Sequence, residues 1–129
     1  MSPSEGQSLS FRPRIAVSIG DPNGVGPEVF LKWFSDDSLT AQVELIPVGS
    51  SSVLEYYGSL LNINGGNDLI VEVDEPKGFR VTPGKLDSSA GALSMVCVER
   101  ATDMCLAQEV QAMVTCPISK EAISAAGYN

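Results

Sequence analysis

The sequence predicts an α/β fold of three layers (α/β/α), with helices on both faces of a largely parallel or mixed sheet. Three observations carry this prediction. Short apolar runs that suit buried strands alternate with segments whose apolar residues recur at helical spacing. Turns that contain Gly and Pro separate the two kinds of segment. The 129 residues, 43% of them hydrophobic and 19% charged, are enough to bury the core of one domain.

The chain is expected to begin with a flexible tail over residues 1–13, followed by an α/β portion over residues 14–129. Residues 14–19 are apolar and predict a short buried strand, which enters a Gly/Pro-rich turn at Gly20. A helix is predicted from Pro27, because the first helical position tolerates the missing N–H of proline. Its apolar residues at helical spacing are Phe30, Trp33 and Phe34.

The middle of the chain supplies two more strands and a helix. Residues 43–48 predict the second strand, which Pro47 weakens or places at a sheet edge. Residues 50–52 are serines that can cap a helix running to Leu61. Residues 68–73 predict the third strand.

The last part of the chain contains the strongest predicted helix, residues 88–108, then a strand over 111–116 and a short helix over 120–126. Ser119 is placed as the N-cap of the short helix and Gly127 as the residue that ends it. The predicted apolar stripe of the long helix consists of Leu93, Val96, Cys97, Ala101, Met104 and Cys105.

Composition excludes several classes of function. The net charge is −8, which argues against binding to nucleic acid or an anionic membrane, since both need clustered Lys and Arg. No apolar run approaches the length that spans a bilayer, and the N-terminus lacks the apolar core of a signal peptide. The three cysteines form no CxxC motif and suit a reducing compartment. A cytoplasmic protein is expected.

The absence of histidine limits the chemistry. Neither a catalytic Ser-His-Asp or Cys-His arrangement nor a histidine metal site can be built from this chain. Any chemistry within these residues must therefore use carboxylates, lysine, hydroxyls, thiols or backbone amides.

The most informative segment is the glycine turn, residues 20–28, between a predicted strand and a predicted helix. Asp21 and Asn23 offer polar contacts near a substrate, while Gly24 and Gly26 allow close backbone approach or a positive φ. The segment fails the P-loop test, because no Lys-Ser or Lys-Thr follows, and the dinucleotide fingerprint, because Val29 holds the third glycine position. A purely structural turn, in which Asp21 caps its own backbone, is the equal alternative.

A second segment, residues 114–123, leaves a predicted strand and opens a helix, where α/β sheets commonly bind ligands. Thr115 and Ser119 supply hydroxyls to a substrate cleft, and Lys120 supplies a cation. The alternative is a capped helix with a solvated lysine. Residues 87–91 read mainly as the cap of the long helix.

Together these segments resemble the 4-hydroxythreonine-4-phosphate dehydrogenase family. Residues 20–28 match its Gly-[Asp/Glu]-Pro-x-Gly-[Ile/Val]-Gly-Pro-Glu opening, and residues 112–123 resemble its Thr-x-Pro-x-x-Lys segment. Between them, Pro83-Gly84-Lys85-Leu86 through Ala90-Gly91 resemble the segment before the family's long helix. The resemblance covers nearly all of the chain after the tail.

The resemblance implies a fold similar to isocitrate and isopropylmalate dehydrogenases. It also implies an NAD-dependent oxidation, with decarboxylation, of 4-phosphohydroxy-L-threonine in pyridoxal phosphate (vitamin B6) biosynthesis. The family requires a divalent metal (Zn, Mg or Co) and forms homodimers with active sites between the subunits. Its partner is a small phosphorylated hydroxy-amino acid.

The chain departs from the family in lacking the Gly-His-Thr-Glu segment, the three metal-ligand histidines, the phosphate-binding basic residues and the nicotinamide-binding region. It is therefore interpreted as an N-terminal portion, expected to bind neither NAD nor metal and to be inactive alone. Two alternatives remain: a related dehydrogenase for another four-carbon phosphorylated hydroxy acid, and a non-catalytic binding module that kept the fold.

Overall fold

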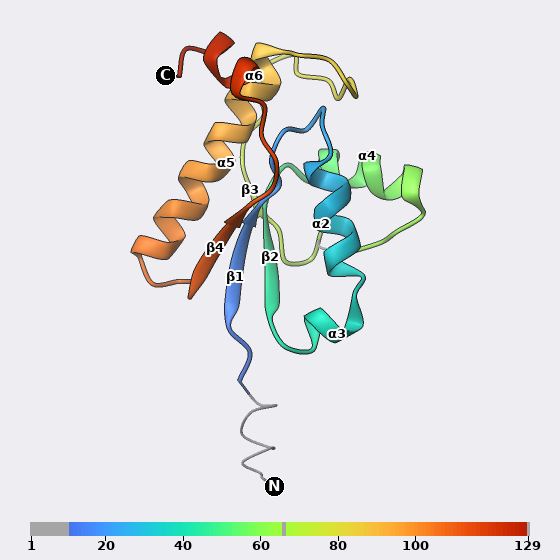
Figure 1. Ribbon diagram of the computed structural model, residues 1–129, viewed down its shortest axis with the longest axis vertical. Coiled ribbons are helices and arrows are strands. Elements are labelled where there is room, and N and C mark those ends of the chain that lie inside the picture. Colours follow the sequence, from blue (N-terminus) through green and yellow to red (C-terminus); the bar gives the residue numbers. More distant parts are fainter. Residues whose placement is uncertain (1–10, 66, 129) are drawn as a thin grey trace, which may run out of the picture.

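The computed structural model describes residues 11–65 and 67–128 and has a four-stranded parallel sheet at its centre (Figure 1). The strands are β1 (Arg14–Ser18), β2 (Glu44–Gly49), β3 (Val71–Glu72) and β4 (Ala112–Thr115), and they lie in the order β3-β2-β1-β4. Every pair is parallel, with β1 paired to both β2 and β4. The predicted α/β class is confirmed, and the sheet of the described residues is parallel throughout.

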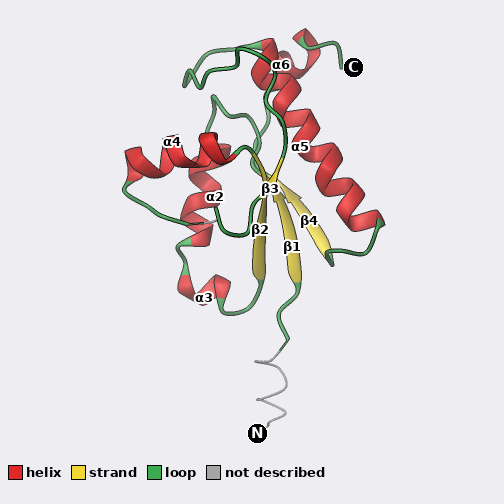
Figure 2. Ribbon diagram, turned by 180° about the vertical axis from the view of Figure 1, so that it is seen from behind, coloured by secondary structure: helices red, strands yellow, loops and turns green. Residues whose placement is uncertain are grey.

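Helices cover both faces of this sheet, as predicted (Figure 2). On one face lie α2 (Gly26–Phe34), α3 (Asp37–Thr40) and α4 (Ser51–Leu61). The long helix α5 (Ser88–Leu106) packs on the other face against β1, β2 and β4. The short helix α6 (Lys120–Ala125) packs on α5. Among the described helices, none combines the length and the apolar character that a bilayer crossing needs.

The apolar stripe of α5 is narrower than predicted. Leu93, Cys97, Ala101 and Met104 are buried against the sheet, and their spacing of four, four and three residues keeps them on one side of the helix. Val96 is 37% exposed and Cys105 is only partly buried, so these two residues lie at the margins of the stripe.

Pro47 lies in an internal strand, because β2 is flanked by β1 and β3. The Val48 carbonyl accepts a hydrogen bond from the Ile19 amide, whereas the Gly49 carbonyl accepts one from the Val73 amide beyond β3. Since backbone groups alternate in direction along a strand, Pro47 faces the β3 side. The pairing with β3 begins only at Val48, so no hydrogen bond is lost at the proline.

The third strand and the segment after α2 differ from the prediction. Residues 67–69 form a turn, so β3 contains only Val71 and Glu72 instead of residues 68–73. The short helix α3 was not predicted. It begins because the Asp36 carboxylate accepts hydrogen bonds from the Ser38 and Leu39 amides, at 3.0 and 3.2 Å. A bond from the Ser38 hydroxyl, together with these amides, lowers the pKa of Asp36.

The ends of the last two helices follow the sequence signals. The Asp87 carboxylate accepts from the Ser89 amide at 3.0 Å, which confirms the cap of α5. The Ser119 hydroxyl accepts from the Ala122 amide at 3.1 Å. Gly127, at φ +102°, ends α6 with hydrogen bonds from Gly127 to Ser124 and from Tyr128 to Ile123. This pair of bonds is the Schellman arrangement.

At the start of α4, Ser50 is the N-cap residue, but its hydroxyl makes no capping bond to the helix backbone. Instead the Glu72 carboxylate accepts from the Ser51 amide at 3.0 Å, and Ser50 and Ser52 donate to Glu75. The cap therefore comes from β3 and the segment that follows it.

The predicted tail lies mostly outside the described residues, which begin at Phe11. The Pro13 carbonyl accepts from the Glu44 amide at 2.8 Å, so backbone pairing with β2 begins before β1 itself.

Candidate functional site

The carboxyl ends of β1 and β4 form a topological switch point. From β1 the chain crosses to β2 and β3 over one face of the sheet, and it returns to β4 through α5 on the other face. The loops that leave β1 and β4 therefore diverge to opposite faces. Open α/β sheets bind ligands outside the carboxyl ends of such strands. Because Ser18 is in register with Thr115, the candidate site comprises the residues that follow these two.

The structure brings the two predicted segments together at this point (Figure 1). The Asp21 amide donates a hydrogen bond of 2.9 Å to the Pro117 carbonyl. Gly20 has φ +79°, and a Cβ there would overlap that same carbonyl oxygen, so only glycine allows the two loops to approach this closely. Asp21 and Pro117, which are 96 positions apart in the sequence, are thus hydrogen-bonded neighbours.

Asp21 and Asn23 make their contacts within the protein. The Asp21 carboxylate accepts from the Asn23 amide at 3.0 Å, which is the local cap that the structural alternative anticipates. Asn23 is 3% exposed, and its side chain accepts from the Thr82 amide at 2.8 Å and donates to the Lys85 carbonyl at 3.2 Å. Asn23 therefore joins the glycine turn to the segment before α5.

The glycine turn is also held by α4. The Tyr57 hydroxyl donates a buried hydrogen bond of 2.6 Å to the Pro22 carbonyl. Burial, with smaller contributions from Tyr56, Asp21 and Glu28, raises the pKa of Tyr57 to about 12. The hydroxyl consequently stays protonated and keeps donating across the physiological pH range.

Gly24 and Gly26 have different surroundings. Neither has the positive φ that was one of the two expected reasons for glycine. A Cβ at Gly26 would overlap the Ile19 carbonyl oxygen, so the close approach made at this position is to the protein's own backbone. At Gly24 the nearest atom to a Cβ would be the Asp21 Oδ2, at 3.3 Å, which is a tight contact with a side chain.

The candidates of the second segment are divided between structural and accessible positions. Thr115 is exposed at the end of β4. The hydroxyl of Ser119 is used in the α6 cap. Lys120 is exposed, and within the described residues no carboxylate lies within ion-pair distance of it. It lies at an apolar hollow of about 430 Å³, whose other lining residues are Met95, Ile118, Ile123, Ser124 and Tyr128.

Sequence reasoning missed Lys85 as a site residue. Its carbonyl is bound by Asn23, so its backbone lies beside the glycine turn, and its side chain is exposed. In the part of the chain that the structure describes, Lys85 has no ion-pair partner. The signal that could have identified it is the Pro83-Gly84-Lys85-Leu86 segment, which is one of the three segments of the family resemblance.

The described residues do not form a metal centre, since no three His, Cys, Asp or Glu side chains gather among them. The buried thiols also offer no nucleophile. Burial raises the pKa of Cys97 to about 12 and that of Cys116 to about 11, so both are neutral near pH 7. The candidate site therefore provides backbone amides, hydroxyls, carboxylates and two lysines, Lys85 and Lys120, that have no ion-pair partner among the described residues.

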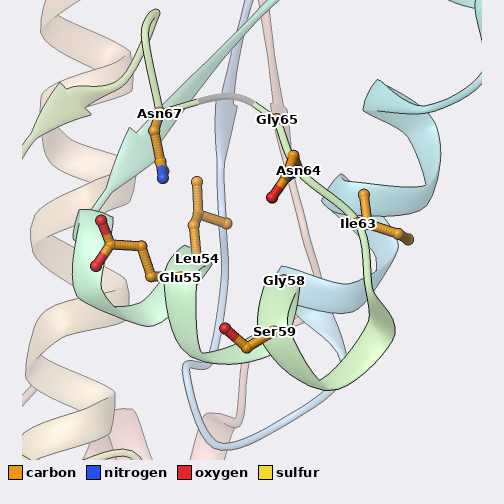
Figure 3. Close-up of a pocket in the computed structure, with 8 residues that line it drawn as sticks. All are labelled: Leu54, Glu55, Gly58, Ser59, Ile63, Asn64, Gly65 and Asn67. Carbon is orange, nitrogen blue, oxygen red and sulfur yellow. The ribbon is translucent and has the colours of Figure 1, made fainter.

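A separate hollow of about 100 Å³ lies where α4 and the loop after it meet (Figure 3). It belongs to the crossover from β2 to β3, not to the switch point between β1 and β4. Among its described lining residues there is no cationic side chain, and the only carboxylate is that of Glu55. Its lining residues are Leu54, Glu55, Gly58, Ser59, Ile63, Asn64, Gly65 and Asn67.

Comparisons with known proteins point to one family. The family model described as "Pyridoxal phosphate biosynthetic protein PdxA" matches residues 36–129. A 4-hydroxythreonine-4-phosphate dehydrogenase from Synechocystis is 38% identical over 125 residues, which cover 91% of this chain and 36% of that protein. A D-threonate 4-phosphate dehydrogenase from Salmonella typhimurium is 33% identical over 131 residues, covering 89% and 40%.

The fold is similar to that of a solved relative. The crystal structure of a 4-hydroxythreonine-4-phosphate dehydrogenase from Klebsiella pneumoniae matches with a TM-score of 0.72 and 30% identity, over 89% of this chain and 40% of that one. The chain thus spans about two-fifths of the length of the relatives that it matches.

Proposed function

Because this chain belongs to the PdxA family of pyridoxal phosphate biosynthetic proteins, we propose that it is the N-terminal part of a dehydrogenase that oxidises 4-phosphohydroxy-L-threonine. The observation that carries the proposal is the convergence of three separate segments at the switch point. The glycine turn is hydrogen-bonded both to the segment around Lys85 and to the segment after β4. These are the segments that resemble the family.

The proposed reaction is oxidation of the substrate hydroxyl followed by loss of carbon dioxide from the resulting β-keto acid. NAD would take up the hydride, and a divalent metal would polarise the alcohol and stabilise the developing enolate. Both groups are implied by the resemblance, and among the described residues no three His, Cys, Asp or Glu side chains gather to hold the metal. The resemblance places the residues that hold them in parts of the family's proteins that this chain does not match.

The role proposed for this chain is to form one wall of the substrate cleft and to supply positive charge to that wall. Thr115 offers a hydroxyl at the carboxyl edge of the sheet, and Asp21 and the glycine backbone form the turn beside it. Lys85 and Lys120 have no ion-pair partners among the described residues, so their charge is available to an anionic substrate. The complete protein is further proposed to be a homodimer in the cytoplasm.

A second substrate is favoured by a specific comparison. The Salmonella relative named D-threonate 4-phosphate dehydrogenase is 33% identical to this chain, as is the Nostoc relative named 4-hydroxythreonine-4-phosphate dehydrogenase. Both names describe four-carbon phosphorylated hydroxy acids that differ in the substituent away from the phosphate. The alternative proposal is therefore oxidation of D-threonate 4-phosphate by the same type of site.

The test compares the 129-residue chain with the complete product of the reading frame that encodes it. Each protein is supplied with NAD, a divalent metal and one of the two substrates, and NADH formation is followed by absorbance. The complete product is expected to reduce NAD with one of the substrates, while the 129-residue chain is expected to be inactive. Turnover by the purified 129-residue chain would contradict the proposal that this chain supplies only one wall of the substrate cleft. Inactivity of the complete product on both substrates would favour a non-catalytic binding module.

A further inference from the structure

The short helix α6 lies against the N-terminal end of α5, where it meets Gly91 (Figure 2). Gly91 is buried, and a Cβ there would overlap the Ala122 carbonyl and lie 2.6 Å from the Ile123 nitrogen. Both groups belong to the backbone of α6, which cannot turn aside as a flexible side chain can. The α6 backbone therefore occupies the space that a side chain at position 91 would fill.

The local backbone geometry does not explain a glycine at this position. Gly91 lies inside α5, and its φ is not positive. A glycine in a helix interior costs about 0.5–1 kcal/mol relative to alanine. The gain that offsets this cost is the close approach of α6, which the methyl group of an alanine would prevent.

The position of α6 depends on this contact. The helix has six residues, which are too few for a helix that is stable on its own. Of these six described residues, Ala122 alone is buried, and its carbonyl is the group that meets Gly91. The place where α6 is held to the rest of the protein is therefore the place where α5 lacks a side chain.

The position of α6 in turn determines where the preceding segment lies. At one end of this segment the Cys116 amide donates to the Ser18 carbonyl at 3.0 Å, so β1 holds it. At the other end Ser119 caps α6. Between them the Pro117 carbonyl accepts from the Asp21 amide at 2.9 Å, which is the bond that joins the segment to the glycine turn. A displacement of α6 would therefore weaken this bond.

We infer that Gly91 is a positioning residue: by leaving room for the α6 backbone, it holds residues 117–120 against the glycine turn. That this surface forms a wall of the substrate cleft rests on the proposed function. Gly91 does not touch the substrate and acts only through α6. From sequence, residues 87–91 read mainly as the cap of α5, and the Asp87 carboxylate alone accounts for that cap.

The first test measures amide hydrogen exchange in the 129-residue chain by NMR. The Asp21 amide, bonded to Pro117, reports the contact between the two segments. The Ile19 amide, bonded to the Val48 carbonyl at 3.2 Å, is an internal reference at the same end of the sheet. Gly91→Ala is expected to raise exchange at Asp21 about tenfold or more relative to Ile19, because the added Cβ displaces α6.

Cys97→Ala is the matched control for a general loss of stability. Cys97 lies on the same helix and is buried against the sheet, so its truncation destabilises the protein without adding bulk beneath α6. It is expected to change the exchange of the Asp21 and Ile19 amides by the same factor. If Gly91→Ala fails to fold, Ala122→Gly removes the buried methyl group of α6 without adding an atom, and it should also raise exchange at Asp21 relative to Ile19. An unchanged ratio in that variant would refute the inference.

The second test measures kcat/KM of the complete product for its phosphorylated substrate, at a temperature at which every variant is folded. A misplacement of about 1 Å can cost about a hundredfold in rate, so Gly91→Ala is expected to lower kcat/KM about ten- to a hundredfold. Cys97→Ala is expected to leave kcat/KM unchanged.

Two results would overturn the inference. One is an exchange ratio between Asp21 and Ile19 in Gly91→Ala that equals the ratio in Cys97→Ala. The other is an unchanged kcat/KM in Gly91→Ala although that ratio has risen. Inactivity of the complete wild-type product on both substrates would count against the proposed function alone, since the exchange ratio still decides whether Gly91 holds the segment in place.

Discussion

The hydroxyl of Tyr57 lies 2.6 Å from the carbonyl oxygen of Pro22 and donates a buried hydrogen bond to it. This bond joins the middle of α4 to the turn that follows β1. Its partner residue in the turn is buried as well, so no water replaces the hydroxyl if it is removed. The position of the glycine turn consequently depends on a helix that lies on one face of the sheet.

Tyr57→Phe is expected to lower the free energy of unfolding by about 1–3 kcal/mol, because the Pro22 carbonyl loses its donor in a buried position. Urea denaturation measures this change. Tyr56→Phe is the matched control: Tyr56 is 39% exposed, and its substitution should change stability by less than about 0.5 kcal/mol. Equal effects at the two tyrosines would contradict the importance of the Pro22 contact.

Alanine substitutions at Gly24 and Gly26 are expected to differ in how much they lower the stability of the protein. Gly26→Ala places a Cβ against the Ile19 carbonyl, and relief of this overlap requires the backbone to move, at a cost of about 1–3 kcal/mol or more. Gly24→Ala meets only the Asp21 side chain at 3.3 Å, which can adjust, so a smaller loss is expected. Thermal unfolding of both variants measures the difference, and a more harmful Gly24→Ala would refute this account.

Ser119→Ala is expected to destabilise the protein by about 1 kcal/mol, because the Ala122 amide loses its capping acceptor. Chemical denaturation provides the measurement. Ser124→Ala, at an exposed position of the same helix, is the control and should be nearly neutral. If the two substitutions had the same effect, Ser119 would not be acting as a cap.

Stability is expected to fall as the pH rises above about 9. Burial raises the pKa of Cys97 and Cys116 from 9.0 to about 12 and about 11, so the folded state keeps thiol protons that the unfolded chain releases. The contribution of these protonated thiols to the free energy of unfolding is fully present below pH 9. Above pH 9 it is lost, by up to about 1.4 kcal/mol per pH unit for each thiol.

Urea denaturation over a pH series measures this decline. Cys116→Ala should make it shallower, whereas Ser124→Ala, at an exposed position with no titratable group, should leave its slope unchanged. A slope that is the same in all three proteins would show that the buried thiols are not its source.

Much of the fold could be predicted because local signals and burial agree. The long helix and the strands at either side of it follow from apolar spacing, and the ends of α6 follow from Ser119 and Gly127. The third strand was predicted too long, since Leu69 and Ile70 are apolar but lie outside the two-residue pairing with β2. The helix α3 has no apolar stripe of its own, and only the Asp36 cap signalled it.

The candidate site could be predicted only in part, because its key contacts join residues far apart in sequence. The segments around Asp21 and Ser119 were recognisable from their composition, and the structure places them in contact. The partners of Asn23, by contrast, lie about sixty residues away, and nothing in its local sequence identifies Thr82 or Lys85 as those partners. The same lack of a local signal hid the bond between Tyr57 and Pro22.

The central position of β1 also sets the order in which the chain can fold during synthesis. Its neighbour β2 follows after a short crossover, but Arg14 must wait for Gln111, a partner 97 residues further along the chain. On the ribosome, β1, β2 and β3 can pair before β4 has emerged from the exit tunnel. Closing so long a loop is entropically slow. Docking of β4, and with it the approach of Pro117 to the glycine turn, is therefore expected to be the last step in forming this sheet.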